Sequence, residues 1–423
     1  MPSEASPSRA VRPAEIPGLT GGRGLACAGV VVVHVLGLAA ATTPAARALA
    51  PLANACVTFF FALSGFLLGR PFLAAILDRR IDGPARPPLR RYARQRVLRI
   101  FPAYVVIFLV ADFALRAVYV GNAVVVQRPH SAIGSGRITD PLRLLEQLTL
   151  THDFLPGQLQ SGINPSWSLT TEVCFYALLP LLAAGGYGLV RRGIAPLRAA
   201  VRLPVLLIGV GLLAKAVDVM GQVRSGLDTT AAQFGPRPLA VFSRSVLVAA
   251  DAFGWGMAAA LVYCVVRRRR RWLAPIAGAV ALAAGGAGWS VADAHYVLAQ
   301  AAFALASGAL LVTATGRDGS GRPAALGRAM DWAPFHFLGR ISYSLYLWHY
   351  PVLLVALRSG WAGPPTPAGS VRSLAVVFAV AVGLATLTYA LIERPALRWG
   401  ARRSAAVTLS SAAAPVPSAA VPL

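Results

Sequence analysis

Charged residues are scarce in this sequence. They make up 13% of its 423 residues, whereas hydrophobic residues make up 56%. A soluble domain carries about 25% charged residues, so the composition excludes an ordinary soluble globular protein. The sequence therefore predicts a membrane protein that crosses the bilayer several times.

Cysteine is scarce as well, and the four cysteines show no spacing typical of a metal-binding site or of a disulfide framework. Cys27, Cys56, Cys174 and Cys264 lie inside or beside apolar runs. They form no C-x-x-C pair and no His/Cys cluster at metal-ligand spacing. We therefore expect neither disulfides nor a bound metal.

Three common catalytic motifs are also missing. The chain contains no G-x-S-x-G elbow, no H-x4-D pair and no Walker A loop. These are the usual parts of a serine-triad hydrolase, of some acyl transferases and of enzymes that use ATP. Any chemistry has to come from other polar residues.

Long apolar runs are abundant. About 20 apolar residues are needed for a helix that crosses the hydrocarbon core of a bilayer. Ten runs of suitable length are bounded by arginine, proline or glycine clusters, and we expect an all-α fold of ten transmembrane helices. The predicted spans are residues 24–41, 52–77, 97–120, 168–190, 203–220, 240–266, 273–291, 296–315, 335–357 and 373–393.

The connections between these spans differ sharply in arginine content. Taken alternately from the N-terminus, one set holds 25 arginines and the other holds 8. Cytoplasmic loops carry the excess of basic residues, so both termini are predicted to be cytoplasmic and the chain to lie in the cell membrane. On this topology the run Arg267 to Arg271 is an anchor, with a possible contact to anionic lipid, rather than a nucleic-acid site.

Several charges within the spans have a partner of opposite sign on the same helix, and the ionisable residues without one are more informative. We expect Asp112 to pair with Arg116 and Lys215 with Asp218, at helical spacings. An unpaired ionisable side chain at bilayer depth is costly and indicates function. The candidates without a partner are Arg23, His34, Arg96, Arg99, Glu172, Arg340 and His349.

Arg23 and His34 are eleven residues apart in the first span. Eleven steps of 100° bring them within about 20° of one another around a helix, and roughly 16 Å apart along it. They should therefore face one shared space, with Arg23 at the cytoplasmic rim and His34 deeper. A histidine that only bonds a neighbouring carbonyl is the alternative.

Arg96 and Arg99 lie on one face at the cytoplasmic start of the third span. Two guanidinium groups at that depth could bind phosphate oxygens in pairs. Basic residues at a cytoplasmic helix end are also ordinary topology signals. Spacing alone favours the second interpretation.

The fourth and ninth spans each carry one buried polar group. Asn164 or Ser166 is placed to cap the fourth span, and Glu172 follows within about a turn of its start, as an acid that orients another group or as a capping acid. His349 stands two residues before Pro351, which cannot donate to the carbonyl one turn back and favours a kink. A kink beside an imidazole suggests a lined cavity.

Taken together, seven stretches resemble the acyltransferase-3 family of integral membrane acyl transferases, in the order of the family and over residues 19 to 395. They are "LTGGRGLACAGVVVVH", "FFFALSGFLL", "RVLR" with "IFPAY", "PSWSLTTEVCFY", "DAFGWGMAAALV", "FLGRISYSLYLWHYPVLL" and "IERP". Two departures occur, because Thr20 stands where the family commonly has an aspartate and Val173 follows Glu172 where further polar residues are common. The first places an acid-arginine pairing at Arg23 in doubt.

The resemblance implies transfer of an acyl group, usually from acyl-CoA, to a hydroxyl of a glycan, a lipid or a metabolite. It places the functional histidine at His34, its partner arginine at Arg23 and acyl-CoA binding at Arg96 and Arg99. Cleavage of the first span as a secretory signal is therefore rejected, because it would remove His34. Glu172 and His349 join the catalytic candidates, and the supporting residues from the same stretches are Ser64, Trp167, Ser168, Arg340 and Tyr346.

The hypothesis is an O-acyltransferase in which His34 acts as general base on the acceptor hydroxyl. Acyl-CoA serves as substrate and no permanently bound cofactor is expected. The rival is a transporter or flippase for acyl groups or glycolipids, which often shows inverted repeats that are not visible here. The predicted parts are a polar tail at 1–18, the transmembrane domain at 19–395 and a disordered cytoplasmic tail at 396–423.

Overall fold

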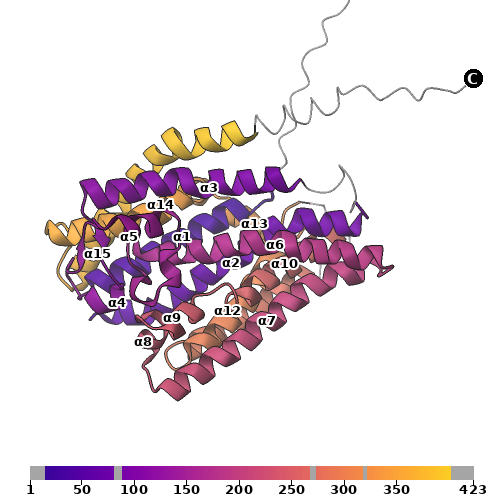
Figure 1. Cartoon of the computed structure of the whole chain (residues 1–423), viewed down its shortest axis with the longest axis horizontal. Helices are drawn as coiled ribbons and strands as arrows, with labels where there is room; N and C mark the ends of the chain where they lie inside the picture. Colours follow the sequence, from indigo (N-terminus) through magenta and orange to yellow (C-terminus); the bar gives the residue numbers. More distant parts are fainter. Residues whose placement is uncertain (1–14, 81–87, 267–272, 318–321, 402–423) are drawn as a thin grey trace, which may run out of the picture.

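The computed structural model describes residues 15–80, 88–266, 273–317 and 322–401, and these form a bundle of long helices (Figure 1). This confirms the all-α prediction. The two termini and the run Arg267 to Arg271 lie outside the described residues. The long helices are α1 (Leu19–Ala39), α2 (Pro44–Leu77), α3 (Leu89–Leu109), α6 (Trp167–Arg191), α7 (Pro196–Ser225), α10 (Ala250–Val265), α11 (Leu273–Val291), α12 (Tyr296–Thr315), α14 (Ala333–Arg358) and α15 (Pro367–Thr388).

Each of the ten predicted spans corresponds to one of these helices. Within the described residues, eight are long and apolar enough to cross a membrane. The other two are α10, which has 16 residues, and α14, which has 26 residues but carries many polar side chains. The side of the membrane on which each terminus lies stays a prediction.

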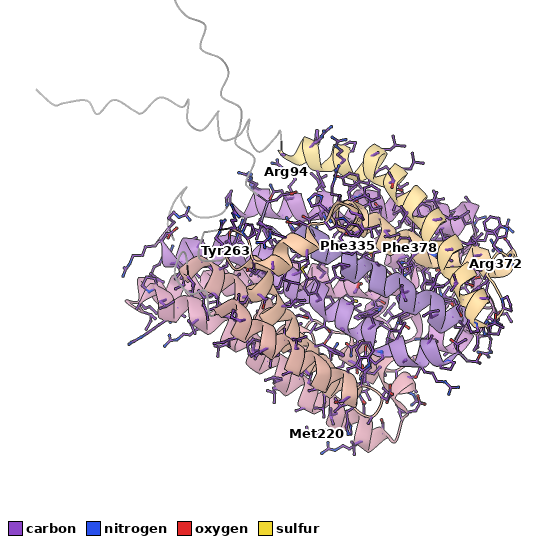
Figure 2. The ribbon with its side chains drawn as sticks, turned by 180° about the vertical axis from the view of Figure 1, so that it is seen from behind. Arg94, Met220, Tyr263, Phe335, Arg372 and Phe378 are labelled. Carbon is purple, nitrogen blue, oxygen red and sulfur yellow. The ribbon has the colours of Figure 1, made fainter. Side chains whose placement is uncertain are left out.

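The outer surface of the bundle is apolar, as expected for contact with lipid. Along α7, Leu213 is 68% exposed and Val223 is 76% exposed. Met220 points away from the bundle at the far end of this helix (Figure 2). Such exposure would be costly in water and is favourable in hydrocarbon.

Three predicted boundaries are wrong. The third span does not reach residue 120, because α3 passes into the π-helix η2 (Val110–Ala114) and then β1 (Val118–Tyr119), which pairs antiparallel with β2 (Ser135–Gly136). The span at 240–266 is broken, since α9 (Pro238–Ser243) and α10 are separate helices. At the C-terminal end, helix continues to residue 401, past the predicted tail boundary at 396.

Both predicted charge pairs are also wrong. Lys215 donates to Asp251 of α10 and to the carbonyl of Val248 rather than pairing with Asp218. These bonds satisfy groups at the break between α9 and α10, which explains why the apolar run does not continue as one helix. Asp112 accepts from the backbone N–H of Ile138 instead of pairing with Arg116.

Segments between the long helices pack tightly onto one end of the bundle. They include the short helices α4 (Ala123–Val126), α5 (Pro141–Leu148) and α8 (Thr229–Phe234), and the 3-10 turns η3 (His152–Phe154), η4 (Pro156–Gln158) and η5 (Asn164–Ser166). Asn122 ties two of these segments together by donating to the carbonyls of Leu159 and Phe234. The short helix α13 (Ala325–Met330) lies at the other end of the bundle, against the start of α1.

Two helix pairs approach closely enough to require glycine. At the α1–α14 crossing, a Cβ on Gly339 would lie 1.8 Å from the carbonyl oxygen of Thr20. At the α2–α10 crossing, a Cβ on Gly256 would lie 1.8 Å from the carbonyl oxygen of Ala62. Small residues allow such backbone contact between membrane helices. The first contact holds α1 against α14, and the second holds α2 against α10. Because α2 also packs on α1, these helices together surround the polar residues of the bundle interior.

Candidate functional site

A cavity of about 110 Å³ opens among α1, α2, α3, α6 and α14. Its wall is mostly apolar, with polar groups at defined points, as is common for sites that bind small molecules. The polar and aromatic lining residues are Arg23, Phe60, Phe61, Ser64, Arg96, Arg99, Ser168, Glu172, Tyr176, Ser342, Tyr343 and Tyr346. Seven of the eleven predicted site residues therefore line one space.

Arg96 lies between two aromatic rings at one end of this cavity. Its guanidinium carbon is 6.0 Å from the ring centre of Tyr92 and 5.6 Å from that of Tyr176. The Nε atom is buried and has no hydrogen-bond partner among the described residues. Neither Arg96 nor Arg23 forms an ion pair with a described residue, so both can bind an anion.

Arg99 differs from Arg96 although it lies only one turn further along α3. Its guanidinium forms an ion pair with Glu393 and also stacks on Tyr343, 5.5 Å from the ring centre. Glu393 is fully buried and accepts a second bond from Ser344, at 3.0 Å. The two arginines are thus not equivalent, although the family resemblance implied acyl-CoA binding at both.

The π-helical turn η6 (Tyr389–Glu393) places this carboxylate. It follows α15 directly and widens the helix just before Pro395. A π-turn is rare and often marks a functional position. Here it carries the acid of the "IERP" stretch to the arginine end of the cavity.

Glu172 also lies at the arginine end. Its Oε1 atom accepts a hydrogen bond of 2.5 Å from Ser64 on α2. Among the described residues it forms no hydrogen bond or ion pair with either predicted histidine. Glu172 therefore does not orient His34 through a direct hydrogen bond. Ser166, which was predicted as a possible cap of α6, makes no side-chain hydrogen bond that would cap this helix.

The two histidines form a pair. His34 Nδ1 and His349 Nε2 are 2.9 Å apart, and the edge of the Tyr350 ring packs against His34 with 5.3 Å between ring centres. His349 is fully buried and His34 is half-buried. Neither residue lines the cavity. Arg23 and His34 were predicted to face one shared space, but Arg23 lines the cavity whereas His34 does not.

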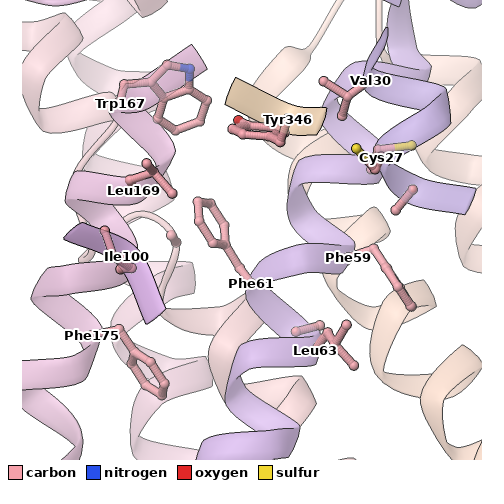
Figure 3. Close-up of a cluster of buried hydrophobic side chains, with 14 of the residues drawn as sticks. Cys27, Val30, Phe59, Phe61, Leu63, Ile100, Trp167, Leu169, Phe175 and Tyr346 are labelled. Carbon is pink, nitrogen blue, oxygen red and sulfur yellow. The ribbon is translucent and has the colours of Figure 1, made fainter. Parts of the chain in front are cut away.

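Tyr346 stands between the cavity and this pair. It lines the cavity, and its ring centre is 5.8 Å from that of His349, one turn further along α14. Its hydroxyl bonds to Ser168 Oγ at 2.7 Å and to the carbonyl of Pro165 at 3.1 Å. Figure 3 shows the Tyr346 ring beside Cys27 and Val30 of α1.

Two predicted supporting residues lie outside the cavity. Trp167 is buried against Phe61 and under the guanidinium of Arg244. Arg340 is exposed and stacks over Tyr389, with 5.7 Å between guanidinium carbon and ring centre. Their roles as site residues stay untested expectations.

Sequence reasoning missed the tyrosines and the acid that surround the arginines. Tyr176, Tyr343 and Glu393 were each inside a quoted stretch, "TTEVCFY", "ISYSLY" or "IERP". Tyr176 follows Glu172 by four residues on α6, and this spacing could have indicated a shared face. No local signal links Glu393 to Arg99, since 294 residues separate them.

Comparison with known proteins shows the family to which the chain belongs. The acyltransferase-3 family pattern, described as an acyltransferase domain, matches residues 16–392. The Acyltransferase MdmB of Streptomyces mycarofaciens is 27% identical over 95% of this chain and 96% of its own length. The Putative peptidoglycan O-acetyltransferase YrhL of Bacillus subtilis (strain 168) is 35% identical over 18% of this chain and 12% of its own.

No solved structure is a significant match. The family match covers nearly all of the described helices that build the cavity and the histidine pair. The chain belongs to the acyltransferase-3 family, and it is a multi-pass membrane O-acyltransferase, an enzyme that transfers acyl groups other than amino-acyl groups.

Proposed function

We propose that the acyl donor is acyl-CoA and that its phosphates bind at the arginine end of the cavity. The observation that carries this proposal is the presence of two guanidinium groups, on Arg23 and Arg96, without an acidic partner among the described residues. A guanidinium binds phosphate oxygens through several N–H groups at once. The tyrosine rings beside Arg96 hold it in place without neutralising it.

The apolar wall beyond the arginines suits the remainder of such a donor. Leu63, Leu67 and Leu68 of α2 line this part of the cavity together with Ile100 of α3. The pantetheine arm of CoA is long and unbranched, so phosphates held at the rim can present a thioester deeper in the bundle. Arg23 and His34 are roughly 16 Å apart along α1, which makes a long arm necessary.

His34 is the proposed general base. Its Nδ1 atom is occupied by the bond to His349, so Nε2 is the atom left to accept the proton of an acceptor hydroxyl. If His34 donates through Nδ1, then His349 Nε2 accepts, and the proton of His349 lies on its own Nδ1. This Nδ1 atom is buried and has no hydrogen-bond partner among the described residues.

In the direct reaction, the acceptor oxygen attacks the thioester carbonyl as His34 takes its proton. The carbon–sulfur bond breaks, and the CoA thiolate leaves and takes up a proton. In the alternative, the imidazole itself is acylated first and the acceptor hydroxyl then displaces it. His349 orients His34 in both routes and is proposed as a positioning residue.

The proposed acceptor is a hydroxyl of a glycan, a glycolipid or a glycosylated metabolite at the cytoplasmic membrane. Support comes from the name of the relative from Bacillus subtilis, which designates a peptidoglycan O-acetyltransferase. Apolar α-helices on all sides of the site require the acceptor to approach from a membrane face. Modification of the cell envelope is the corresponding role.

Purified protein tests the proposal directly. The protein in detergent is incubated with radiolabelled acetyl-CoA and with total envelope glycans, or extracted metabolites, from a strain that lacks this gene. We expect label in a covalent ester product that alkali releases. Label that crosses vesicle membranes without forming any ester would favour the rival transporter, and label transferred from other donors alone would exclude acyl-CoA.

Arg96→Lys should weaken donor binding while leaving insertion normal. Lysine keeps the positive charge but loses the planar group that stacks on Tyr92 and binds two oxygens at once. The loss of one charge-assisted contact, about 1 kcal/mol, predicts a roughly fivefold rise in the acyl-CoA dissociation constant. Isothermal calorimetry in detergent measures it.

Arg91→Lys is the matched control, since Arg91 is exposed on the same helix end. It should bind acyl-CoA like the wild type. If the Arg96→Lys protein binds acyl-CoA as tightly as the wild type, Arg96 is a topology signal and not part of the donor site.

A further inference from the structure

The cavity ends one helical turn short of the histidine pair. On α14, Ser342, Tyr343 and Tyr346 line it in succession, at the spacing of one helix face. His349 is the next residue on that face, but it does not line the cavity. An acyl group held in the cavity is therefore separated from His34 and His349 by the side chain of Tyr346.

The matching face of α1 is filled as well. Arg23 lines the cavity and His34 belongs to the pair, while Cys27 and Val30 between them are fully buried. Figure 3 shows both of these side chains beside the Tyr346 ring. Cys27 is fixed further by its bond to the carbonyl of Ser342, at 3.3 Å.

Packing of the ring and hydrogen bonds of the hydroxyl both hold the Tyr346 side chain in place. The hydroxyl is held by Ser168 and Pro165 at the start of α6. The ring packs at its edge against Phe60, with 6.0 Å between ring centres. A rotation of this one side chain would join the cavity to the histidine pair, whereas Cys27 and Val30 are too short to block or open the path alone.

We propose that Tyr346 is a specificity-determining residue, whose ring narrows the passage from the cavity to His34 and so sets the size of the acyl group that can pass. This inference rests on the proposed acyl-CoA donor. A wall of fixed size discriminates by about 1–3 kcal/mol, or 10- to 200-fold, for each methylene that does not fit. The wild type should accordingly prefer short acyl groups and lose activity steeply as the chain lengthens.

The test compares Tyr346→Ala with the wild type on acetyl-, butyryl-, hexanoyl- and octanoyl-CoA. We expect the ratio of kcat/KM for octanoyl-CoA to that for acetyl-CoA to rise at least tenfold. Tyr346→Phe keeps the ring and removes only the hydroxyl, so its chain-length profile should stay close to that of the wild type. Tyr343→Ala is the matched control, because it enlarges the same cavity at the arginine end. It should lower kcat/KM by the same factor for every acyl-CoA donor.

The outcomes separate this inference from the proposed function. A wild type inactive with every acyl-CoA would refute the donor assignment itself. An active wild type with an unchanged profile in Tyr346→Ala, or an equal shift in Tyr343→Ala, would overturn the role of Tyr346. Tyr346→Leu provides a second enlarged variant if the alanine protein does not fold, and the same unchanged profile in it would be equally decisive.

Discussion

His34→Ala should lower acyl transfer at least 100-fold. A positioned general base contributes about 10²- to 10⁴-fold, and alanine has no group that can take the proton of the acceptor hydroxyl. The protein should still insert and fold, because His34 is only half-buried and its one side-chain hydrogen bond is to His349. Turnover with labelled acetyl-CoA, together with thermal unfolding in detergent, measures both effects.

Two further variants make this test specific. His336→Ala, at the exposed start of α14, controls for removing an imidazole from the same bundle. His349→Ala should lower acyl transfer less than His34→Ala does, since it removes the hydrogen bond that orients the base but leaves the base itself in place. More than a tenth of wild-type turnover in His34→Ala would contradict the assignment, as would a greater loss from His349→Ala.

Arg99→Met should destabilise the protein by about 3–5 kcal/mol, which is the usual cost of removing one partner of a buried ion pair. The reason is the carboxylate of Glu393, which is fully buried and would be left with Ser344 as its remaining partner. Unfolding of the detergent-solubilised protein, followed by heat or denaturant, should show a clear loss of stability. Arg96→Met, which breaks no ion pair, should unfold nearly like the wild type.

The double variant Arg99→Met, Glu393→Gln gives the decisive comparison. With both charges gone, no uncompensated charge remains in the interior, and most of the stability should return. A double variant less stable than Arg99→Met alone would show that the pair does not explain the loss. Full stability in Arg99→Met would mean that Arg99 is free to bind the donor, as the family resemblance implied.

The sequence predicted those features that depend on local periodicity. Span positions follow from the length of apolar runs, and the shared face of Arg23 and His34 follows from eleven steps along one helix. The structure brings Ser64, Glu172 and Tyr346 into the same cavity as Arg23. Their functional roles stay proposals.

Contacts between distant helices could not be predicted in this way. Tyr346 meets Ser168 across 178 residues, and Arg99 meets Glu393 across 294. Periodicity says which face of a helix is buried but not which helix it meets. The break between α9 and α10 could not be predicted for the same reason. Its polar groups, the carbonyl of Val248 and the carboxylate of Asp251, accept hydrogen bonds from Lys215 of another helix.

The π-helical turn at the end of α15 has a consequence for how related sequences are aligned. A π-turn holds one residue more than the α-helix around it, and one residue corresponds to a rotation of about 100°. A relative with a single deletion between Tyr389 and Glu393 would have a regular helix there, and its acid would point away from the position of Arg99. A one-residue gap at this place is therefore a change of architecture, and such a relative should carry an uncharged residue at the position of Arg99 or a new acid elsewhere.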